Sequence, residues 1–396
     1  MNCLTKARFA STTFKQLCHL LILASLPFSA VAQELLLPSE VPAVNNLLDS
    51  QADAKSLKCE VHPRAPSLDF NFHFEAGFVL IVRPPRITAG QEFVAYLRVT
   101  PQGASPTLLE AAFQFPSSHS NAPPDGDTGG LRNAELSISG AFDLGEGRYT
   151  VELLLLDAPH SCFKRWTVQT GKYNSRVISL ALKPHTVAPL APQSWDGNLH
   201  PNGVRLTVLL DAAPIDAFSP RLHAWDRALL LQALASLLTQ IPCQSVDLVA
   251  FNLDQQRQVF RRQAFDSAAF DELANVLKNT EQDTIPYQAL RRGSARRFLQ
   301  QLVQEQTSGD PPDAVIFLGP ATHFDDAMVM QPSRLRFYYL EFHYPGPLFP
   351  DIIARLTRAL GGTVLPFTSA NDLALAIQKL LAWVGPPQSD HEPSQR

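Results

Sequence analysis

The first half of the chain alternates apolar and polar residues in short runs. Residues 68–74 place leucine or phenylalanine at every second position, and residues 92–100 repeat this spacing. Such alternation is typical of a strand with one buried face. A turn at Ala76-Gly77 is predicted to lead from the first run into a strand over 78–82. Further runs lie at 108–115, 134–142, 149–156 and 162–170, and the whole pattern predicts an antiparallel β-sandwich.

The second half changes to apolar runs that alternate with amphipathic segments. Strands are predicted at 204–210, 245–251, 258–265, 313–318, 335–342 and 363–367. Helices are predicted at 222–240, 268–277, 287–304, 349–360 and 372–383. Strand–helix alternation of this kind favours an α/β fold with a mostly parallel, doubly wound sheet covered on both faces.

These patterns divide the 396 residues into two domains with connecting segments, in line with about 150 residues per domain. The predicted segments are a leader over 33–60, a β-sandwich over 61–183, a proline-rich linker over 184–202, the α/β domain over 203–384 and a disordered tail over 385–396. The spaced prolines of the linker make it semi-rigid. Gly147-x-Tyr149-x-Val151, which follows a glycine turn, resembles immunoglobulin-like domains.

The N-terminus has the features of a secretory signal. Lys6, Arg8 and Lys15 accompany an apolar run over 17–26, and Ala30-Val31-Ala32 has the small-x-small pattern of a cleavage site. The run is shorter than the roughly 20 residues that span a bilayer. We therefore expect a signal peptide over 1–32 and an exported chain, periplasmic or extracellular, without an integral membrane segment. An uncleaved anchor is the alternative.

Charge and cysteine content change with that cleavage. The signal carries three basic and no acidic residues, so the net charge of −4 becomes −7 in the mature chain. Neither value is the positive net charge that is typical of a nucleic-acid-binding protein. Cys59, Cys162 and Cys243 remain, and export favours disulfides. Because Cys59 and Cys162 flank the β-domain, we predict that they pair; three buried thiols are the alternative.

The order of elements after residue 203 resembles the von Willebrand factor A-like domain. An apolar strand ends in Asp211, and a long helix, a strand with an edge strand, two helices and three further β-α steps follow. With a signal and a β-domain in front, the chain resembles the exported bacterial proteins called VWFA-related. The resemblance implies a Rossmann-like sheet and a metal-ion-dependent adhesion site at the ends of its strands.

That family site is only partly present in this sequence. It uses Asp-x-Ser-x-Ser, a later threonine and an aspartate after the fourth strand, which are oxygen ligands suited to Mg²⁺. Here Asp211 is followed by Ala213 and Ile215, and Gly319 replaces the second aspartate. The threonine is Thr280 or Thr284. Polar residues of the same loops could form a rebuilt cation site, or they are merely solvated; they are Asp216, His323, Asp325 and Asp326. We therefore predict no bound cofactor, with Mg²⁺ as the alternative.

Catalytic motifs are missing, and one charge cluster stands out. The sequence has no Gly-x-Ser-x-Gly, no phosphate-binding glycine loop and no His-Glu-x-x-His. Arg291, Arg292, Arg296 and Arg297 form a basic stripe on the predicted helix over 287–304. The stripe suits an acidic partner or an anionic component of the envelope, or it is a solvated helix face.

These features favour an exported, non-enzymatic binding or scaffolding protein. Its A-like domain would hold a protein partner at the cell envelope or outside the cell without a metal ion. Two other classes stay open. One is a metal-dependent adhesion protein with a rebuilt divalent-cation site, and the other is an envelope enzyme with an unrecognised site.

Overall fold

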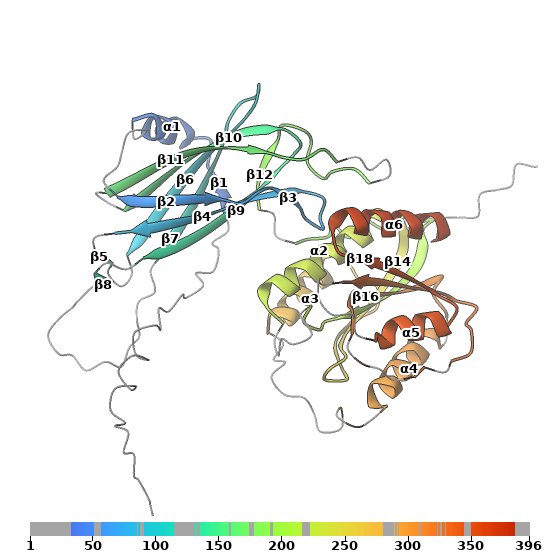
Figure 1. Ribbon diagram of the computed structural model, residues 1–396. Coiled ribbons are helices and arrows are strands. Elements are labelled where there is room, and N and C mark those ends of the chain that lie inside the picture. Colours follow the sequence, from blue (N-terminus) through green and yellow to red (C-terminus); the bar gives the residue numbers. More distant parts are fainter. Residues whose placement is uncertain are drawn as a thin grey trace, which may run out of the picture.

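A computed structural model describes most of residues 33–384, which fold into two units (Figure 1). The described residues exclude 51–56, 85, 88–90, 115–130, 133–134, 158–159, 174–177, 191–192, 216–221, 280–288, 290, 292, 309, 323, 325–326, 329 and 344–349. The predicted signal peptide and the predicted tail therefore lie outside the described residues. Within the described part, every helix is too short or too polar to span a bilayer.

The first unit contains two antiparallel sheets of five strands each. One has the order β1 (Glu34–Leu35), β7 (Thr107–Gln114), β6 (Glu92–Pro101), β10 (Arg148–Asp157) and β11 (His160–Gln169). The other has the order β12 (Val187–Pro189), β9 (Leu136–Leu144), β4 (Phe74–Arg83) and β2 (Lys58–Pro63), with β3 (Ser67–Leu68) also paired to β4. A small ribbon pairs β5 (Arg86–Ile87) with β8 (Leu131–Arg132).

Alternating burial along the strands builds the core of this unit. Every second residue of β4 and of β6 is buried, and these residues share one apolar cluster with side chains of β9 and β10. The cluster therefore draws on both sheets. Cys59 in β2 and Cys162 in β11 form a disulfide with their Cα atoms 6.4 Å apart. The pairing expected from the sequence thus joins the edges of the two sheets, and Cys243 is a buried free thiol.

Two segments predicted as connections belong to the folded units instead. In the predicted leader, β1 pairs with β7, and α1 (Val41–Ser50) packs Leu48 against Leu154. In the predicted linker, β12 pairs with β9. Trp195, also in the linker, is buried and stacks on Phe265 with ring centroids 5.7 Å apart. Apolar residues among the prolines anchor both segments, so neither is a free spacer.

The predicted turn at Ala76-Gly77 is wrong, because both residues lie inside β4. The chain reverses earlier, between β3 and β4. There the carboxylate Oδ1 of Asp69 accepts hydrogen bonds from the backbone nitrogens of Asn71 (3.0 Å) and His73 (2.7 Å). An aspartate that binds its own backbone in this way closes a turn without glycine. The alternating run over 68–74 is therefore a hairpin tip and not a strand.

The second unit is built on a mixed six-stranded sheet. Its order is β15 (Arg257–Arg262), β14 (Cys243–Asn252), β13 (Val204–Asp211), β16 (Ala314–Pro320), β17 (Arg336–Phe342) and β18 (Thr363–Phe367). Five helices accompany it in the described residues, namely α2 (Ala224–Gln240), α3 (Ser267–Asn279), α4 (Ser294–Thr307), α5 (Ile352–Ala359) and α6 (Ala370–Val384). The strand β15 runs antiparallel to β14, and the other neighbours are parallel.

Helices cover both faces of this sheet (Figure 1). Side chains of α2, α3 and α6 share one apolar cluster with Leu206, Val208 and Leu210 of β13. Side chains of α4 and α5 share another with Leu209 of the same strand. Because successive residues of a strand point to opposite faces, β13 is buried on both sides.

The predicted fold class, α/β with a mostly parallel, doubly wound sheet, is wrong for this chain. Among the described residues, strands make up 40% and helices 27%, two of the larger sheets are antiparallel, and the third is mixed. In the third sheet the reason is the connection between Asn252 and Arg257, which is too short for a crossover and therefore makes a hairpin. In addition, no helix lies between β16 and β17 in the described residues, where the resemblance implied one.

Candidate functional site

The carboxyl ends of the central strands gather several buried polar side chains. Asp211 ends β13 and Asn252 ends β14. Glu341 lies near the end of β17, and Asp351 precedes α5. Open sheets that contain parallel strands bind ligands at this edge. The edge is therefore the candidate site that the prediction of Asp211 pointed to.

Asp211 is almost completely buried at the end of the central strand. Its Oδ1 accepts a hydrogen bond of 3.3 Å from the backbone nitrogen of Leu253, whereas its Oδ2 is buried without a hydrogen-bond partner. Burial, together with the charges of Asp254 and Asp351, raises the pKa of Asp211 well above its usual value. The raised pKa favours the neutral form of the carboxyl group, and a neutral acid is a poor ligand for a cation.

Gly319 lies against Asp211 from the neighbouring strand β16. A Cβ atom at position 319 would lie 2.8 Å from Cβ of Asp211 and 3.0 Å from its carbonyl oxygen. Contacts this short require backbone movement, so the packing of β13 against β16 demands glycine here. An aspartate at this position, as in the family site, does not fit between the two strands.

Asp351 organises the neighbouring part of the edge. Its Oδ1 accepts hydrogen bonds from the backbone nitrogen of Ala354 (3.0 Å) and from Oγ1 of Thr322 (3.1 Å). Its Oδ2 accepts a third from the backbone nitrogen of Thr322 (3.0 Å). The first of these contacts is an N-cap for α5. Asp351 thus ties the loop after β16 to the start of α5.

Tyr339 reaches the same carboxylate from the middle of β17. Its hydroxyl lies 2.7 Å from the carbonyl oxygen of Pro320 and 3.1 Å from Oδ2 of Asp351, and its one proton serves one acceptor at a time. Burial and the charges of Asp351, Glu341 and Asp211 raise the pKa of Tyr339 well above its usual value. The phenol therefore stays protonated and acts as a hydrogen-bond donor.

Glu341 and His343 complete the edge. Nε2 of His343 lies 3.0 Å from Oε2 of Glu341, and the side chain of Glu341 is 8% exposed. Burial raises the pKa of Glu341, and the charge of Asp351 adds to that effect, while the nearby His343 opposes it. Burial thus raises the pKa of Asp211, Tyr339 and Glu341 at this edge.

The sequence-predicted metal ligands are only partly described. Asp211 stands where the prediction placed it, at the end of the first strand of the sheet. Thr284, Asp325 and Asp326 lie outside the described residues, as do the alternatives Thr280, Asp216 and His323. Among the described residues, one group of three ligand-bearing side chains converges within 4.8 Å, and it does not include Asp211.

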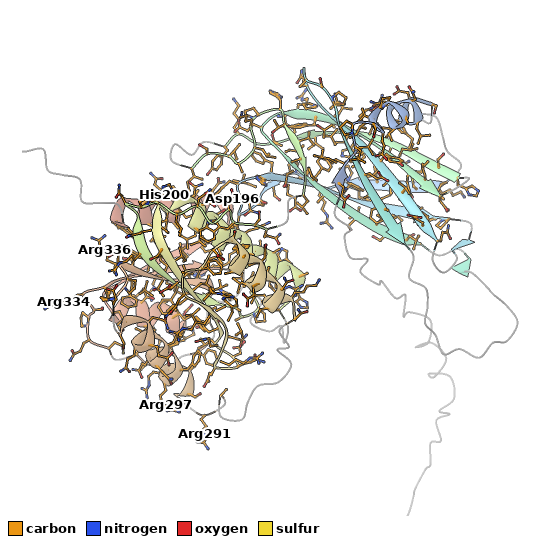
Figure 2. The ribbon with its side chains drawn as sticks, turned by 180° about the vertical axis from the view of Figure 1, so that it is seen from behind. Asp196, His200, Arg291, Arg297, Arg334 and Arg336 are labelled. Carbon is orange, nitrogen blue, oxygen red and sulfur yellow. A yellow bond between two sulfur atoms is a disulfide. The ribbon has the colours of Figure 1, made fainter. Side chains whose placement is uncertain are left out.

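The predicted basic stripe is divided in the structure. The helix α4 begins at Ser294, so Arg296 and Arg297 lie in its first turn, but Arg291 precedes it. The prediction of a helix that begins near 287 is therefore wrong for Arg291, because Gly293 adopts φ 73° immediately before α4. Figure 2 labels Arg291 and Arg297 at the same end of the second unit. Arg292 lies outside the described residues.

A second polar cluster lies in the first unit and was not predicted. Nδ1 of His73 lies 3.1 Å from Oδ2 of Asp143, and Asp69 supplies the third donor of the convergent group. One nitrogen and two carboxylates are a donor set that a divalent metal can use. The three residues come from a hairpin tip and from β9, which are 70 residues apart in the chain. In the sequence, this cluster is indicated only by the presence of Asp69 and His73 in the same alternating run over 68–74.

Comparisons with known proteins leave the family unassigned. No family model and no curated protein matches the chain. A β-glucosidase from Listeria innocua is 12% identical with a TM-score of 0.19, covering 30% of this chain and 16% of the enzyme. The structural-genomics target SoR45 is 10% identical with a TM-score of 0.19, and the match covers 34% of this chain and 97% of the target. CsgH from R. palustris is 13% identical with a TM-score of 0.17, and the match covers 28% of this chain and 91% of CsgH. Similarity this weak says nothing about function.

Proposed function

We propose that this chain is an exported, non-enzymatic binding protein whose second unit is a degenerate von Willebrand factor A-like domain. The unit would hold an acidic protein partner through exposed arginines and without a metal ion. The first unit would be an immunoglobulin-like spacer or recognition module. In support of that second part, the hydroxyl of buried Tyr149 donates a 2.8 Å hydrogen bond to the carbonyl of Gly145. A tyrosine that bonds the backbone a few residues upstream is a hallmark of immunoglobulin-like sandwiches.

The observation that carries the proposal is the contact between Gly319 and Asp211. At Gly319 the strand β16 passes so close to Asp211 that a side chain would not fit. The family's second aspartate therefore has no room at this position. The carboxyl group of Asp211 is buried, its pKa is raised by that burial, and it accepts one hydrogen bond from the backbone nitrogen of Leu253. The residues at this edge thus favour a structural role over cation binding.

The arginines near the start of α4 offer a different surface for a partner. Arg291 and Arg297 are exposed, and neither they nor Arg296 make an ion pair with a described residue. By contrast, Arg205, Arg261 and Arg262 each pair with a nearby carboxylate. Arginines that make no ion pair with the described residues have bidentate donors that suit a carboxylate of another molecule. In a chain of net negative charge, such a surface suits an acidic partner.

Affinity capture from envelope extract tests the proposal. The wild-type protein is expected to retain the same partner with and without EDTA. Arg291→Glu combined with Arg297→Glu is expected to weaken retention at least about tenfold, because charge reversal makes the contact repulsive. Lys278→Glu combined with Lys379→Glu changes the net charge equally at exposed positions of α3 and α6 and is the matched control. Equal loss in both double variants would contradict a specific arginine surface.

One observation favours the alternative of a rebuilt cation site. Oδ2 of Asp211 is a buried oxygen without a hydrogen-bond partner, and a bound ion or water would satisfy such an atom. Calorimetry with Mg²⁺, Mn²⁺ and Ca²⁺ separates the two proposals. A binding isotherm that disappears in Asp211→Ala, together with EDTA-sensitive capture, would replace the metal-free mechanism with the metal-dependent one.

A further inference from the structure

Three side chains that can bind a metal ion meet where the hairpin tip joins β9. Asp69 and His73 come from the tip and Asp143 comes from β9, and their donor atoms lie within 4.8 Å of one another. Nδ1 of His73 lies 3.1 Å from Oδ2 of Asp143. Two atoms bound to the same zinc ion lie about 3.0 to 3.5 Å apart, because each bond is about 2.0–2.2 Å long. The imidazole of His73 and the carboxylate of Asp143 are therefore already spaced as two ligands of one ion.

The turn fixes the carboxylate of Asp69 through one of its two oxygens. Oδ1 accepts hydrogen bonds from the backbone nitrogens of Asn71 and His73, at 3.0 and 2.7 Å. Oδ2 contacts Nε2 of Gln232 at 3.4 Å, which is longer than the usual upper value of about 3.2 Å for such a hydrogen bond. Each oxygen of an ionised carboxylate has two lone pairs. Oδ2 can therefore bind a cation while Oδ1 keeps the turn closed.

The surrounding backbone fixes the ligands relative to one another. His73 directly precedes β4, and β4 pairs with β9 so that Glu75 stands opposite Asp143. At the other end of the tip, Phe70 is buried in an apolar cluster with side chains of the second unit. A site that is assembled in advance loses little conformational entropy when its ligand binds. The arrangement therefore favours binding of an ion over rearrangement of the loop.

Buried donors and access from solvent are combined in this cluster. The side chain of Asp143 is 2% exposed, whereas that of His73 is 16% exposed. Burial strengthens the attraction between a cation and a carboxylate, because the local dielectric constant is low. The exposed edge of His73 gives an ion a route from solvent, which a metal site requires.

The cluster carries more negative than positive charge. Asp69 lies in the field of Asp143 and Glu75 as well as that of His73, and Arg64 acts on Glu75. With the acids ionised and the imidazole neutral, three carboxylates and one guanidinium leave two negative charges. A divalent cation would balance that charge, and the neutral imidazole is the form that binds metals.

We propose that Asp69, His73 and Asp143 bind a divalent transition-metal ion, and that Zn²⁺ is the ion that suits them best. Zinc accepts imidazole nitrogen together with carboxylate oxygen, whereas Mg²⁺ prefers oxygen ligands alone. Water completes the coordination. The bound ion fastens the hairpin tip to β9 and stabilises the first unit. Because Asp211 and the arginines near α4 belong to the second unit, this site does not depend on the proposed function.

Calorimetry on the purified protein tests the site. The protein is treated with EDTA, dialysed free of chelator and titrated with Zn²⁺ at pH 8. Burial raises the pKa of Asp69 to about 7, so this pH favours the ionised ligand. One saturable site per chain is expected, and Mg²⁺ is expected to bind at least about tenfold more weakly. Zn²⁺ is also expected to raise the melting temperature, because an ion that binds the folded chain stabilises it.

Variants and a spectrum identify the ligands. His73→Ala and Asp143→Asn are each expected to weaken Zn²⁺ binding at least about tenfold and to abolish the rise in melting temperature. His62→Ala removes an exposed histidine of β2 and is the matched control, with affinity expected to equal that of the wild type. Circular dichroism confirms that each variant is folded. X-ray absorption at the zinc edge needs no variant. It is expected to show nitrogen and oxygen ligands at about 2.0–2.2 Å and no sulfur at about 2.3 Å.

Each of four outcomes would overturn the proposal. The first is a wild-type protein that binds no Zn²⁺ saturably. The second is equal affinity in His73→Ala and the wild type, which would assign the ion to other histidines. The third is a sulfur ligand in the spectrum, which would assign it to Cys243. The fourth is loss of binding in Asp211→Ala with full binding in His73→Ala, which would place the ion at the sheet edge of the second unit.

Discussion

The hydroxyl of Tyr339 lies 3.1 Å from Oδ2 of Asp351, so a side chain from the middle of β17 is connected to the cap of the helix that follows. The same carboxylate accepts hydrogen bonds from Thr322 after β16 and from the first turn of α5. One acidic residue therefore connects two strands and a helix at the edge of the sheet. Asp351 therefore holds these elements together, and its contribution can be measured as a change in the free energy of unfolding.

Asp351→Ala is expected to lower the free energy of unfolding by about 3 kcal/mol. The change removes an N-cap, worth about 1 kcal/mol, and leaves the two buried donors of Thr322, its backbone nitrogen and its hydroxyl, without their acceptor, whereas Tyr339 keeps the carbonyl oxygen of Pro320. Urea denaturation at pH 7 measures the loss. Asp372→Ala is the matched control, because Asp372 accepts hydrogen bonds from Thr368 and Ser369 at the exposed start of α6. We expect about 1 kcal/mol there. Equal losses in both variants would show that Asp351 is only a cap.

Gly319→Ala is expected to destabilise the second unit by about 1–3 kcal/mol, because the new methyl group forces β13 and β16 apart. Thermal and urea unfolding measure the change. Gly171→Ala is the control, since the nearest atom to its new Cβ would be a ring carbon of Phe74 at an ordinary 3.9 Å. Tolerance of alanine at 319 would mean that the strands can separate. The space for a ligand beside Asp211 would then exist after all.

Local periodicity predicted the strands better than it predicted their directions and ends. The run over 92–100 became β6 because its buried residues recur at every second position. The run over 68–74 has the same alternation, yet Asp69 turns its backbone, and Phe70 and Phe72 are buried in a loop. Alternation reports which side chains are buried, but it does not distinguish a strand from a hairpin tip held by one carboxylate.

The candidate site shows a similar limit. Asp211 was found because it ends an apolar strand, which is a local signal. Asp351, Tyr339 and Thr322 were not, because their contacts join residues 12 and 29 positions apart and depend on which strands are neighbours. The loss of the family ligand at Gly319 could be read from the sequence. The steric reason for that glycine required the distance to Asp211.

Loss of the disulfide between Cys59 and Cys162 is expected to destabilise the first unit strongly. The bridge joins residues 103 positions apart, and closing a loop of that length is worth up to about 4.7 kcal/mol in the chain-entropy model. Thermal unfolding with and without reductant measures the effect. The double variant Cys59→Ala, Cys162→Ala should unfold at the lower temperature in both conditions. If reductant lowers the melting temperature of that variant further, Cys243 or another process is responsible.

Asp211→Asn is expected to stabilise the protein at pH 8, although it alters a residue at the candidate site. The pKa of Asp211 is raised in the folded chain by burial and by the charges of Asp254 and Asp351. The stability that the protonated acid contributes is complete below its usual value of 3.8 and is lost as the pH rises toward the raised value. Asparagine keeps the shape and one acceptor oxygen but binds no proton in this range.

The difference between wild type and Asp211→Asn should therefore be small near pH 4 and should grow to at least about 1 kcal/mol in favour of the variant at pH 8. Urea denaturation across that range, with EDTA present, measures it. Asp271→Asn, at an exposed position of α3, should show no such growth. If the difference instead moves in favour of the wild type as the pH rises, the carboxylate is ionised in the folded protein. The edge of the sheet must then supply a positive charge to it.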